Sequence, residues 1–270
     1  MSDPDMKLET VNVLFDGAAA TIELNRPQAL NAWNKQLAQD LLTALRHAAE
    51  SERVRAVCIT GAGRAFSSGA DLKDMGSEDL TPEGRPDVFK VLTERYHPIM
   101  HAIRELPKPV IATVRGGAVG IGCSLALCCD LVIAGESSYF LLAFVNIGLA
   151  PDGGSSVFVP ARVGMARAAE MSMLGERVSA AQALDWGLVN RVVPDDDLLA
   201  EGTALLERLA AGPTRSYAAS KRLINAQLYG RMEEQLHLEA TLQQELAGSD
   251  DLVEGVSAFL GKRPPVFQGR

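Results

Sequence analysis

The sequence predicts an α/β protein with a mostly parallel sheet, followed by a helical C-terminal region. Two observations support this fold class. Short apolar strands alternate with glycine turns and helices up to about residue 156, and from Val157 onward the apolar spacing is mostly helical. The 270 residues permit one large or two small domains. We expect a core over residues 1–200 and a helical region over residues 201–270.

The N-terminal segment predicts a hairpin, a helix and a strand in that order. Residues 11–15 and 18–24 are strand-like and are joined at Asp16-Gly17, a strong hairpin signal. Residues 34–51 place leucines and alanines on one face at helical spacing. The segment VRAVCITG (54–61) then returns to strand character.

The middle of the chain repeats a strand, turn and helix order. The expected elements are a glycine-rich segment leading into a helix (61–75), a polar loop (74–87), a helix (88–106), a buried strand (110–114), a glycine turn running into an apolar helix (116–130) and two short strands (131–135 and 137–142). We expect the polar loop to form part of the wall of a ligand pocket.

The C-terminal part predicts mainly helices. A helix follows Val157, a short helix over 179–186 is closed by Gly187, residues 188–193 form a strand, and three helical stretches continue to Leu260. These helical stretches carry leucine and alanine faces for which the sequence shows few packing partners in the same chain. We therefore expect them to pack against another subunit and the protein to be an oligomer.

Composition argues against several classes of function. The formal charge is −8 and no run of Lys or Arg occurs, so a nucleic-acid partner is not expected. Without an apolar run of membrane length or a signal peptide, no membrane partner is expected either, and we predict a cytoplasmic protein. The four cysteines lack zinc-site spacing and are expected to be reduced and buried. His97 and His101 lack the E-x-x-H pattern, so we expect no metal site.

Three glycine turns, FSSGAD, GGAVGIG and APDGG, stand where strands lead towards helices. Backbone N–H groups at helix starts have no partner within the helix and can bind a ligand. Neither a dinucleotide fingerprint nor a P-loop is present. Two explanations stay open: the glycines only allow close helix-to-sheet packing, or two N–H groups converge on one carbonyl oxygen as an oxyanion hole.

Asp152 lies in the third turn, between Pro151 and two glycines. Aspartate before a helix is commonly an N-cap, whose carboxylate accepts hydrogen bonds from the first N–H groups. A carboxylate held by a rigid turn beside a ligand can instead move a proton. The local sequence allows both.

The chain resembles the crotonase superfamily, also called the enoyl-CoA hydratase/isomerase family, nearly from end to end. The resemblance rests on LNRPQALNAW (24–33), GRAFSSGADL (63–72), LPKPVIATVRGGAVGIGCSLALCCDLVIA (106–134), IGLAPDGGSS (147–156) and AQALDWGLVNRVV (181–193). It implies a spiral of ββα units with a C-terminal helical trimerisation region, assembled as a homotrimer or a dimer of trimers. It also implies an acyl-CoA thioester as substrate, with no separate cofactor because coenzyme A is part of that substrate.

The resemblance implies roles for particular positions. The backbone N–H groups of Ala70 and Ile121 correspond to the oxyanion-hole donors. The remaining implied residues are contacts to the coenzyme A or acyl part of the substrate: Arg26, Ala29, Ser68, Asp71, Leu72, Lys73, Phe144 and, from a neighbouring subunit, Lys262 or Phe259.

Two departures from the family pattern bear on the reaction. The glutamates with which hydratases of the family activate water correspond here to Ser124 and Phe144. Neither side chain can take a proton from water at pH 7, so ordinary hydration is expected to be lost or severely reduced. Asp152 resembles the acid of ring-epoxide isomerases acting on phenylacetyl-CoA and of related enoyl-CoA isomerases. The resemblance therefore implies an isomerase with one acid/base, whose pKa burial could raise.

Three other functions stay open. One is an aroyl-CoA dehalogenase, in which Asp152 attacks the ring and His101 acts as base. Another is a hydratase that uses Asp152 and water differently. The third is a CoA-binding protein of the same fold without catalytic activity, since fold alone does not decide function.

Overall fold

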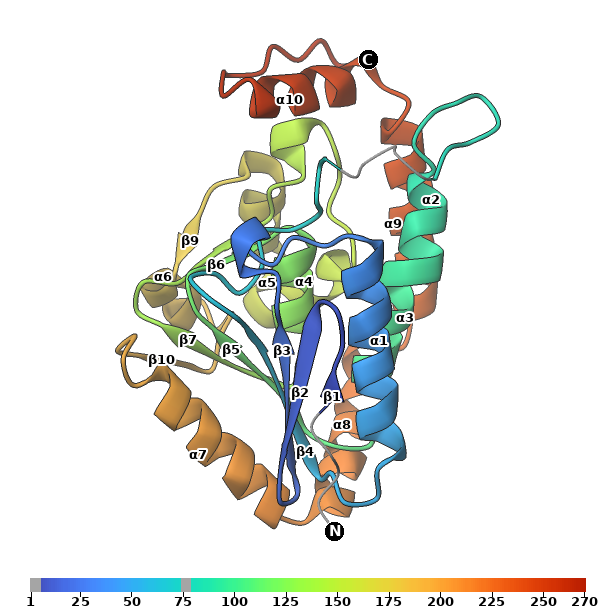
Figure 1. Cartoon of the computed structure of the whole chain (residues 1–270). Coiled ribbons are helices and arrows are strands. Elements are labelled where there is room, and N and C mark those ends of the chain that lie inside the picture. Colours follow the sequence, from blue (N-terminus) through green and yellow to red (C-terminus); the bar gives the residue numbers. More distant parts are fainter. Residues whose placement is uncertain (1–5, 74–78) are drawn as a thin grey trace.

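The computed structural model describes residues 6–73 and 79–270, and it has the expected α/β architecture. Its main sheet runs in the order β1-β2-β3-β4-β5-β7-β10 (Figure 1). The strands are β1 (Met6–Lys7), β2 (Val11–Asp16), β3 (Ala19–Leu24), β4 (Ala56–Gly61), β5 (Val110–Val114), β7 (Leu131–Gly135) and β10 (Arg191–Val193). The predicted hairpin pairs β2 and β3 antiparallel, and pairing from β3 to β10 is parallel.

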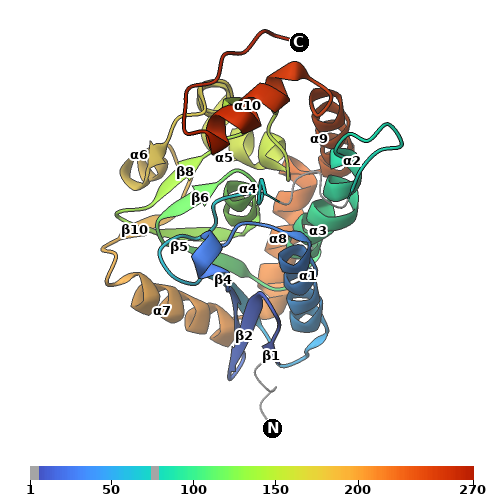
Figure 2. The same ribbon diagram turned by 45° about the horizontal axis from the view of Figure 1, so that its top comes forward.

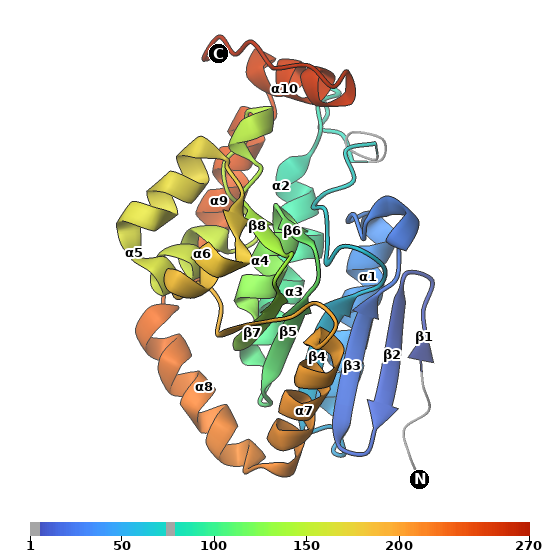
Figure 3. The same ribbon diagram turned by 90° about the vertical axis from the view of Figure 1, so that its left-hand side faces the viewer.

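Helices cover both faces of this sheet. α1 (Lys35–Glu50) packs on β2 and β3 and against α3 (His97–Glu105), whereas α7 (Leu198–Ala211) contacts β3, β4, β5 and β7. Figure 3 shows α1 and α7 on opposite sides of the strands. Burial on both faces explains why all five residues of β5 are buried and four of them are apolar, without the alternation of a half-exposed strand.

The predicted helix over residues 88–106 contains a π-helical turn. It consists of α2 (Val88–Val91), the π segment η2 (Leu92–Tyr96) and α3. The extra residue of a π turn rotates the following side chains relative to an unbroken α-helix. Tyr96, at its end, packs edge-on against Trp33, with ring centroids 5.1 Å apart.

A second, three-stranded sheet runs in the order β6-β8-β9. Figure 2 shows β6 and β8 beside α4. The elements of this part are β6 (Gly117–Val119), α4 (Ile121–Cys128), β8 (Tyr139–Leu141), α5 (Ser155–Leu174), β9 (Val178–Ser179) and α6 (Ala180–Asp185). Gly117–Val119, expected within a turn, forms a strand because its backbone pairs with Tyr139–Leu141.

The C-terminal part differs in two details from its prediction. The fully described segment from residue 198 onward holds four helices where three were expected: α7, α8 (Thr214–Leu228), α9 (Met232–Leu246) and α10 (Asp250–Leu260). The breaks between them fall at residues 212–213, 229–231 and 247–249. α9 also packs on α2 and α5 of the same chain (Figure 1), so its apolar face has partners within the subunit.

Long polar side chains cap helices from distant segments. Lys108 is buried, and its ammonium group donates to the carbonyls of Ala48, Ala49 and Ser51 at 2.7, 3.2 and 2.7 Å. These carbonyls end α1 and have no partner within the helix. A charged donor there stabilises the helix end and ties it to the strand that follows Lys108.

The remaining predictions are partly tested. All four cysteines are free and buried, as predicted. The helix expected to follow SSGAD is not found over its described part, because Leu72 and Lys73 form a turn, and residues 74–78 of the predicted polar loop lie outside the described residues. Among the described residues no helix is long and apolar enough to cross a membrane, and no group of three or more acidic, histidine or cysteine side chains could hold a metal ion.

Candidate functional site

Two glycine turns meet because their backbones pair in register. Ser67 and Ala118 form a parallel bridge, with Ser67 N donating to Gly117 O at 3.0 Å and Val119 N donating to Ser67 O at 2.9 Å. Ala70 and Ile121 each lie three residues beyond this bridged pair. The equal offset brings the two predicted oxyanion-hole residues to neighbouring positions.

Close approach at this point requires glycine. A Cβ atom at Gly69 would lie 3.0 Å from the carbonyl oxygen of Val119 and 3.8 Å from the Cα atom of Gly120. Both glycines have a positive φ, 94° at Gly69 and 53° at Gly120, which disfavours other residues. The predicted packing role of these glycines is therefore real, and it does not exclude a ligand role.

The N–H groups of Ala70 and Ile121 donate no hydrogen bond to any of the described residues. Trp33 bonds to the residues on either side of Ala70, through Gly69 O and Asp71 N, so the Ala70 N–H points away from Trp33. Ile121 is the first residue of α4, where an N–H has no partner within the helix. Both amides are thus available to an acceptor.

Asp152 does not cap the following helix. The N-cap of α5 is Gly154, and the Asp152 side chain lies elsewhere: it is 7% exposed, and its Oδ2 accepts a hydrogen bond from Gln243 Nε2 at 2.7 Å. Its Oδ1 is buried and has no partner among the described residues. The structure therefore excludes the helix-cap explanation that the local sequence allowed.

Glu239 of α9 caps α5 instead. Its carboxylate accepts hydrogen bonds from Gly154 N at 2.8 Å, from Ser156 N at 3.1 Å and from the Ser156 hydroxyl. Burial raises the pKa of Glu239 to about 7, against the lowering effect of these hydrogen bonds. Burial, and then the charge of Glu239, raise the pKa of Asp152 to about 8, while the Gln243 hydrogen bond lowers it.

The turn that carries Asp152 (residues 150–156, the acid turn) is in direct contact with Ile121. A Cβ atom at Gly153 would lie 2.2 Å from Ile121 Cδ1, so the two segments touch there. Ser124, one of the two positions where hydratases carry a glutamate, donates its hydroxyl to Asp152 O at 2.8 Å. Phe144, the other position, lies with its ring 3.9 Å from a Cβ atom built at Gly120. Ser124 thus holds the turn that carries Asp152.

The residues predicted to contact coenzyme A at positions 26, 29, 68 and 71–73 lie close together around the turn that carries Ala70. Arg26 pairs with Asp71 at 3.1 Å, Ser68 donates its hydroxyl to Ala29 O at 3.4 Å, and Lys73 N donates to Asp71 at 3.4 Å. Leu72 lies between these residues and is half-buried. The structure thus brings these residues together, and their contact with coenzyme A stays a prediction.

Lys262 is not part of this cluster within one subunit. It follows α10, is exposed, and its backbone N–H bonds to Phe259 O at 3.2 Å. Phe259 is 62% exposed. The sequence placed both residues in the site of a neighbouring subunit, and this placement stays a prediction.

His101 lies in a different environment from Asp152. Its Nε2 is 2.9 Å from Glu233, and it lines a cavity of about 170 Å³ together with His97 and His237. Asp152 shares none of these contacts, and no histidine contributes to its pKa shift. The geometry therefore gives no support to a dehalogenase in which His101 and Asp152 act together.

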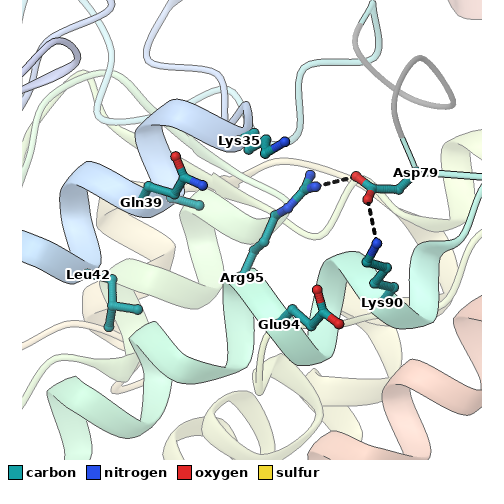
Figure 4. A pocket seen from close by; sticks show the side chains of 8 residues that line it. Lys35, Gln39, Leu42, Asp79, Lys90, Glu94 and Arg95 are labelled. Carbon is teal, nitrogen blue, oxygen red and sulfur yellow. Dashed lines mark hydrogen bonds and ion pairs between the residues drawn. The ribbon is translucent and has the colours of Figure 1, made fainter.

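A second cavity, of about 250 Å³, lies between α1 and the α2–η2 segment (Figure 4). Arg95 and Lys90 both reach Asp79 there, Lys90 at 3.3 Å, and Lys35 and Glu94 complete the charged lining. The Arg95 and Lys90 charges hold the pKa of Asp79 below its usual value against the raising effect of its partial burial. The lining of this cavity includes none of the predicted site residues, so its size does not mark the reactive centre.

Sequence reasoning missed Glu239 and Gln243. A signal existed, because the buried face of α9 consists of Met232, Leu236, Glu239, Ala240 and Gln243. Two polar residues in the apolar stripe of an amphipathic helix indicate buried groups with specific partners. Which partners they have depends on where α9 packs.

The fold and the paired turns confirm the crotonase-superfamily resemblance. The chain belongs to the enoyl-CoA hydratase/isomerase family, whose model matches residues 15–270. A probable enoyl-CoA hydratase of Rhodobacter capsulatus is 44% identical over 98% of this chain and all of its own length. The 1,2-epoxyphenylacetyl-CoA isomerase of Escherichia coli is 39% identical over 93% of this chain and 95% of its own. A crystal structure of an enoyl-CoA hydratase from Mycobacterium avium subsp. paratuberculosis has a TM-score of 0.88 at 38% identity and covers 97% of this chain and 100% of its own.

Proposed function

We propose that this protein is an acyl-CoA isomerase that shifts a double bond, or opens a ring epoxide, through a thioester enolate. The N–H groups of Ala70 and Ile121 bind the thioester oxygen, and Asp152 moves the proton. Arg26, Ala29, Ser68, Asp71, Leu72 and Lys73 bind the coenzyme A part, and Phe144 contacts the acyl part. One observation carries the proposal: the buried carboxyl of Asp152, with one free oxygen, lies in a turn that touches Ile121.

For a 3-enoyl thioester the reaction is a transfer of one proton. Ionised Asp152 takes the proton from C2, and the C2–H electron pair moves into the conjugated enolate, whose oxygen is held by the two amides. The same carboxyl then returns the proton to C4, the double bond lies between C2 and C3, and the carboxylate is regenerated. A single carboxyl is sufficient because no water is added.

The relatives of this chain include both an isomerase and a probable hydratase. The 39% identical isomerase of Escherichia coli supports the first, and the 44% identical probable hydratase supports the second. We favour the isomerase because Ser124 uses its hydroxyl on a backbone carbonyl and Phe144 has no proton to exchange, so the water-activating pair of a hydratase is missing.

The test is to incubate the purified protein with 3-enoyl-CoA, 2-enoyl-CoA and an epoxide of phenylacetyl-CoA. Double-bond movement, epoxide opening and water addition are followed separately. We expect isomerisation of the first or third substrate, and an Asp152→Asn variant with about 100-fold or greater loss of kcat. Asp185→Asn, at an exposed position of α6, is the matched control. A folded Asp152→Asn variant with unchanged turnover, or water addition as the main reaction, would contradict the proposal.

A homotrimer or dimer of trimers is the assembly that we propose. Large apolar side chains are exposed on the outer helices, and these are Met165 and Met173 of α5, Leu199 of α7, and Leu223, Ile224 and Leu228 of α8. Large apolar side chains exposed on helices in this way are expected to be covered by another subunit. Light scattering coupled to size-exclusion chromatography tests the assembly directly, and a monomeric mass would contradict it.

A further inference from the structure

Two side chains of α9 reach the turn that carries Asp152. Glu239 and Gln243 are one helical turn apart, so they project from the same face of α9. Glu239 is 3% exposed and Gln243 is fully buried. They lie 87 and 91 residues beyond Asp152 in the chain, and together they hold the segment from Ala150 to Ser156.

The orientation of the Gln243 amide follows from its partners. Nε2 donates to Ala150 O and to Asp152 Oδ2, both at 2.7 Å. A backbone carbonyl can only accept, so the position beside it must be occupied by the NH₂ group and not by the amide oxygen. Asp152 Oδ2 therefore faces a donor in either protonation state of the carboxyl.

This arrangement decides where the proton of Asp152 is carried. An oxygen that faces a donor at 2.7 Å accepts a hydrogen bond and cannot carry a proton directed at the same donor. The other oxygen, Oδ1, is buried and has no partner among the described residues. The proton therefore resides on Oδ1 when the carboxyl is neutral, and Oδ1 is the oxygen left free to exchange it.

Glu239 adds a negative charge beside this carboxyl. It is fixed by three donors at the start of α5, so it does not turn towards a substrate. Of the described residues, Glu239 is the titratable group that acts on Asp152; α4 presents Ser124 and Ile121 to the acid turn, α5 presents Ser155, and these side chains are uncharged. The charge of Glu239 favours the protonated form of Asp152.

We infer that Gln243 and Glu239 are positioning residues for Asp152: Gln243 reserves Oδ1 for proton exchange, and Glu239 opposes ionisation of the carboxyl. This inference rests on the proposed function, because it assigns their effect to the acid/base of that reaction. The two residues act in opposite directions. Gln243 stabilises the carboxylate with a hydrogen bond, whereas Glu239 destabilises it with a like charge.

The test uses two variants of the full-length protein and the pH profile of kcat/KM for isomerisation. Gln243→Met keeps the length of the side chain and removes the donor, so the pKa of Asp152 rises and the pH of half-maximal kcat/KM moves up by about 1 unit. Glu239→Gln removes the charge, so the pKa of Asp152 falls and the midpoint moves down by about 1 unit. Gln243→Met also lowers kcat about 10-fold with little change in KM, because Oδ1 is no longer singled out.

Matched controls on the same helix are Gln244→Met and Glu245→Gln. Gln244 bonds to Pro86 O and Phe89 N, and Glu245 is exposed, so neither variant should move the profile. Circular dichroism verifies that each variant is folded. If Glu239→Gln does not fold, the upward shift in Gln243→Met decides alone.

The outcomes separate this inference from the proposed function. Opposite shifts in the two variants support it. Unmoved midpoints, or shifts in the same direction, overturn it while an inactive Asp152→Asn variant leaves the proposed function intact. Full turnover in Asp152→Asn overturns both.

Discussion

Replacing Asp152 by asparagine should make the stability of the protein less dependent on pH. The pKa of this carboxyl is raised from 3.8 to about 8 by burial and by Glu239. Between these two values the unfolded chain has released the proton while the folded protein retains it. The folded state therefore binds more protons, and the free energy of unfolding falls as the pH rises through this window. Asparagine has no proton to release, so this contribution disappears.

The magnitude follows from the size of the shift. About 4 pKa units at 1.36 kcal/mol each set an upper bound of about 6 kcal/mol over the whole window. About 3 kcal/mol of this lies between pH 5.5 and pH 8.5. At pH 5.5 the carboxyl is neutral in the folded state and asparagine is close to it in shape. We therefore expect the variant to gain about 3 kcal/mol relative to the wild type when the pH is raised to 8.5.

Urea unfolding measures this difference. Trp33 is 1% exposed and reports unfolding by its fluorescence. The two proteins are compared at pH 5.5 and pH 8.5 at one protomer concentration, because assembly contributes to apparent stability. Asp185→Asn controls for the loss of an ordinary exposed carboxyl. If the difference between wild type and Asp152→Asn is the same at both pH values, Asp152 does not retain its proton in the folded state and the reasoning is refuted.

Two further predictions concern the core. Lys108→Met leaves the carbonyls of Ala48, Ala49 and Ser51 without their donor and should lower the free energy of unfolding by about 2–4 kcal/mol; a loss below about 1 kcal/mol in urea unfolding would contradict the assigned capping role. Burial raises the pKa of the Cys58 thiol to about 11 and the pKa of the Cys123 and Cys128 thiols to about 12. Ellman's reagent should therefore label the cysteines at pH 8 only after the protein is unfolded. Rapid labelling of the folded protein would contradict their burial.

The strands of the main sheet and the helices that cover it could be predicted because their residues form local patterns in the sequence. The Asp16-Gly17 turn between two short apolar runs predicts the hairpin, and the mostly apolar run at Val110–Val114 predicts a buried strand. The tail was predicted as three helical stretches and contains four helices. One of its breaks, at residues 229–231, has Gly230 as its only typical turn residue, and an isolated glycine is also tolerated within a helix.

The candidate site was predictable in its residue types and less so in its geometry. The glycines at 69 and 120 indicated close backbone approach, but the pairing of Ser67 with Ala118 that sets the equal offset of Ala70 and Ile121 is a contact across 51 residues. No local pattern encodes such a register, because it depends on how two strand ends align.

By itself, the sequence determined the α/β class, the family resemblance, the buried free cysteines and the presence of a single acid in the PDGG turn. Only the tertiary structure decided whether the carboxyl of Asp152 caps the following helix or lies elsewhere. From sequence alone, an aspartate before a helix could be the residue that caps its first N–H groups. In this structure Glu239 of α9 accepts the hydrogen bonds from the N–H groups at the start of α5. The carboxyl of Asp152 is therefore not the cap of α5, and it lies buried beside Gln243. The physical reason is that hydrogen-bond partners and burial are properties of the packed chain, and they arise between residues that the sequence keeps far apart.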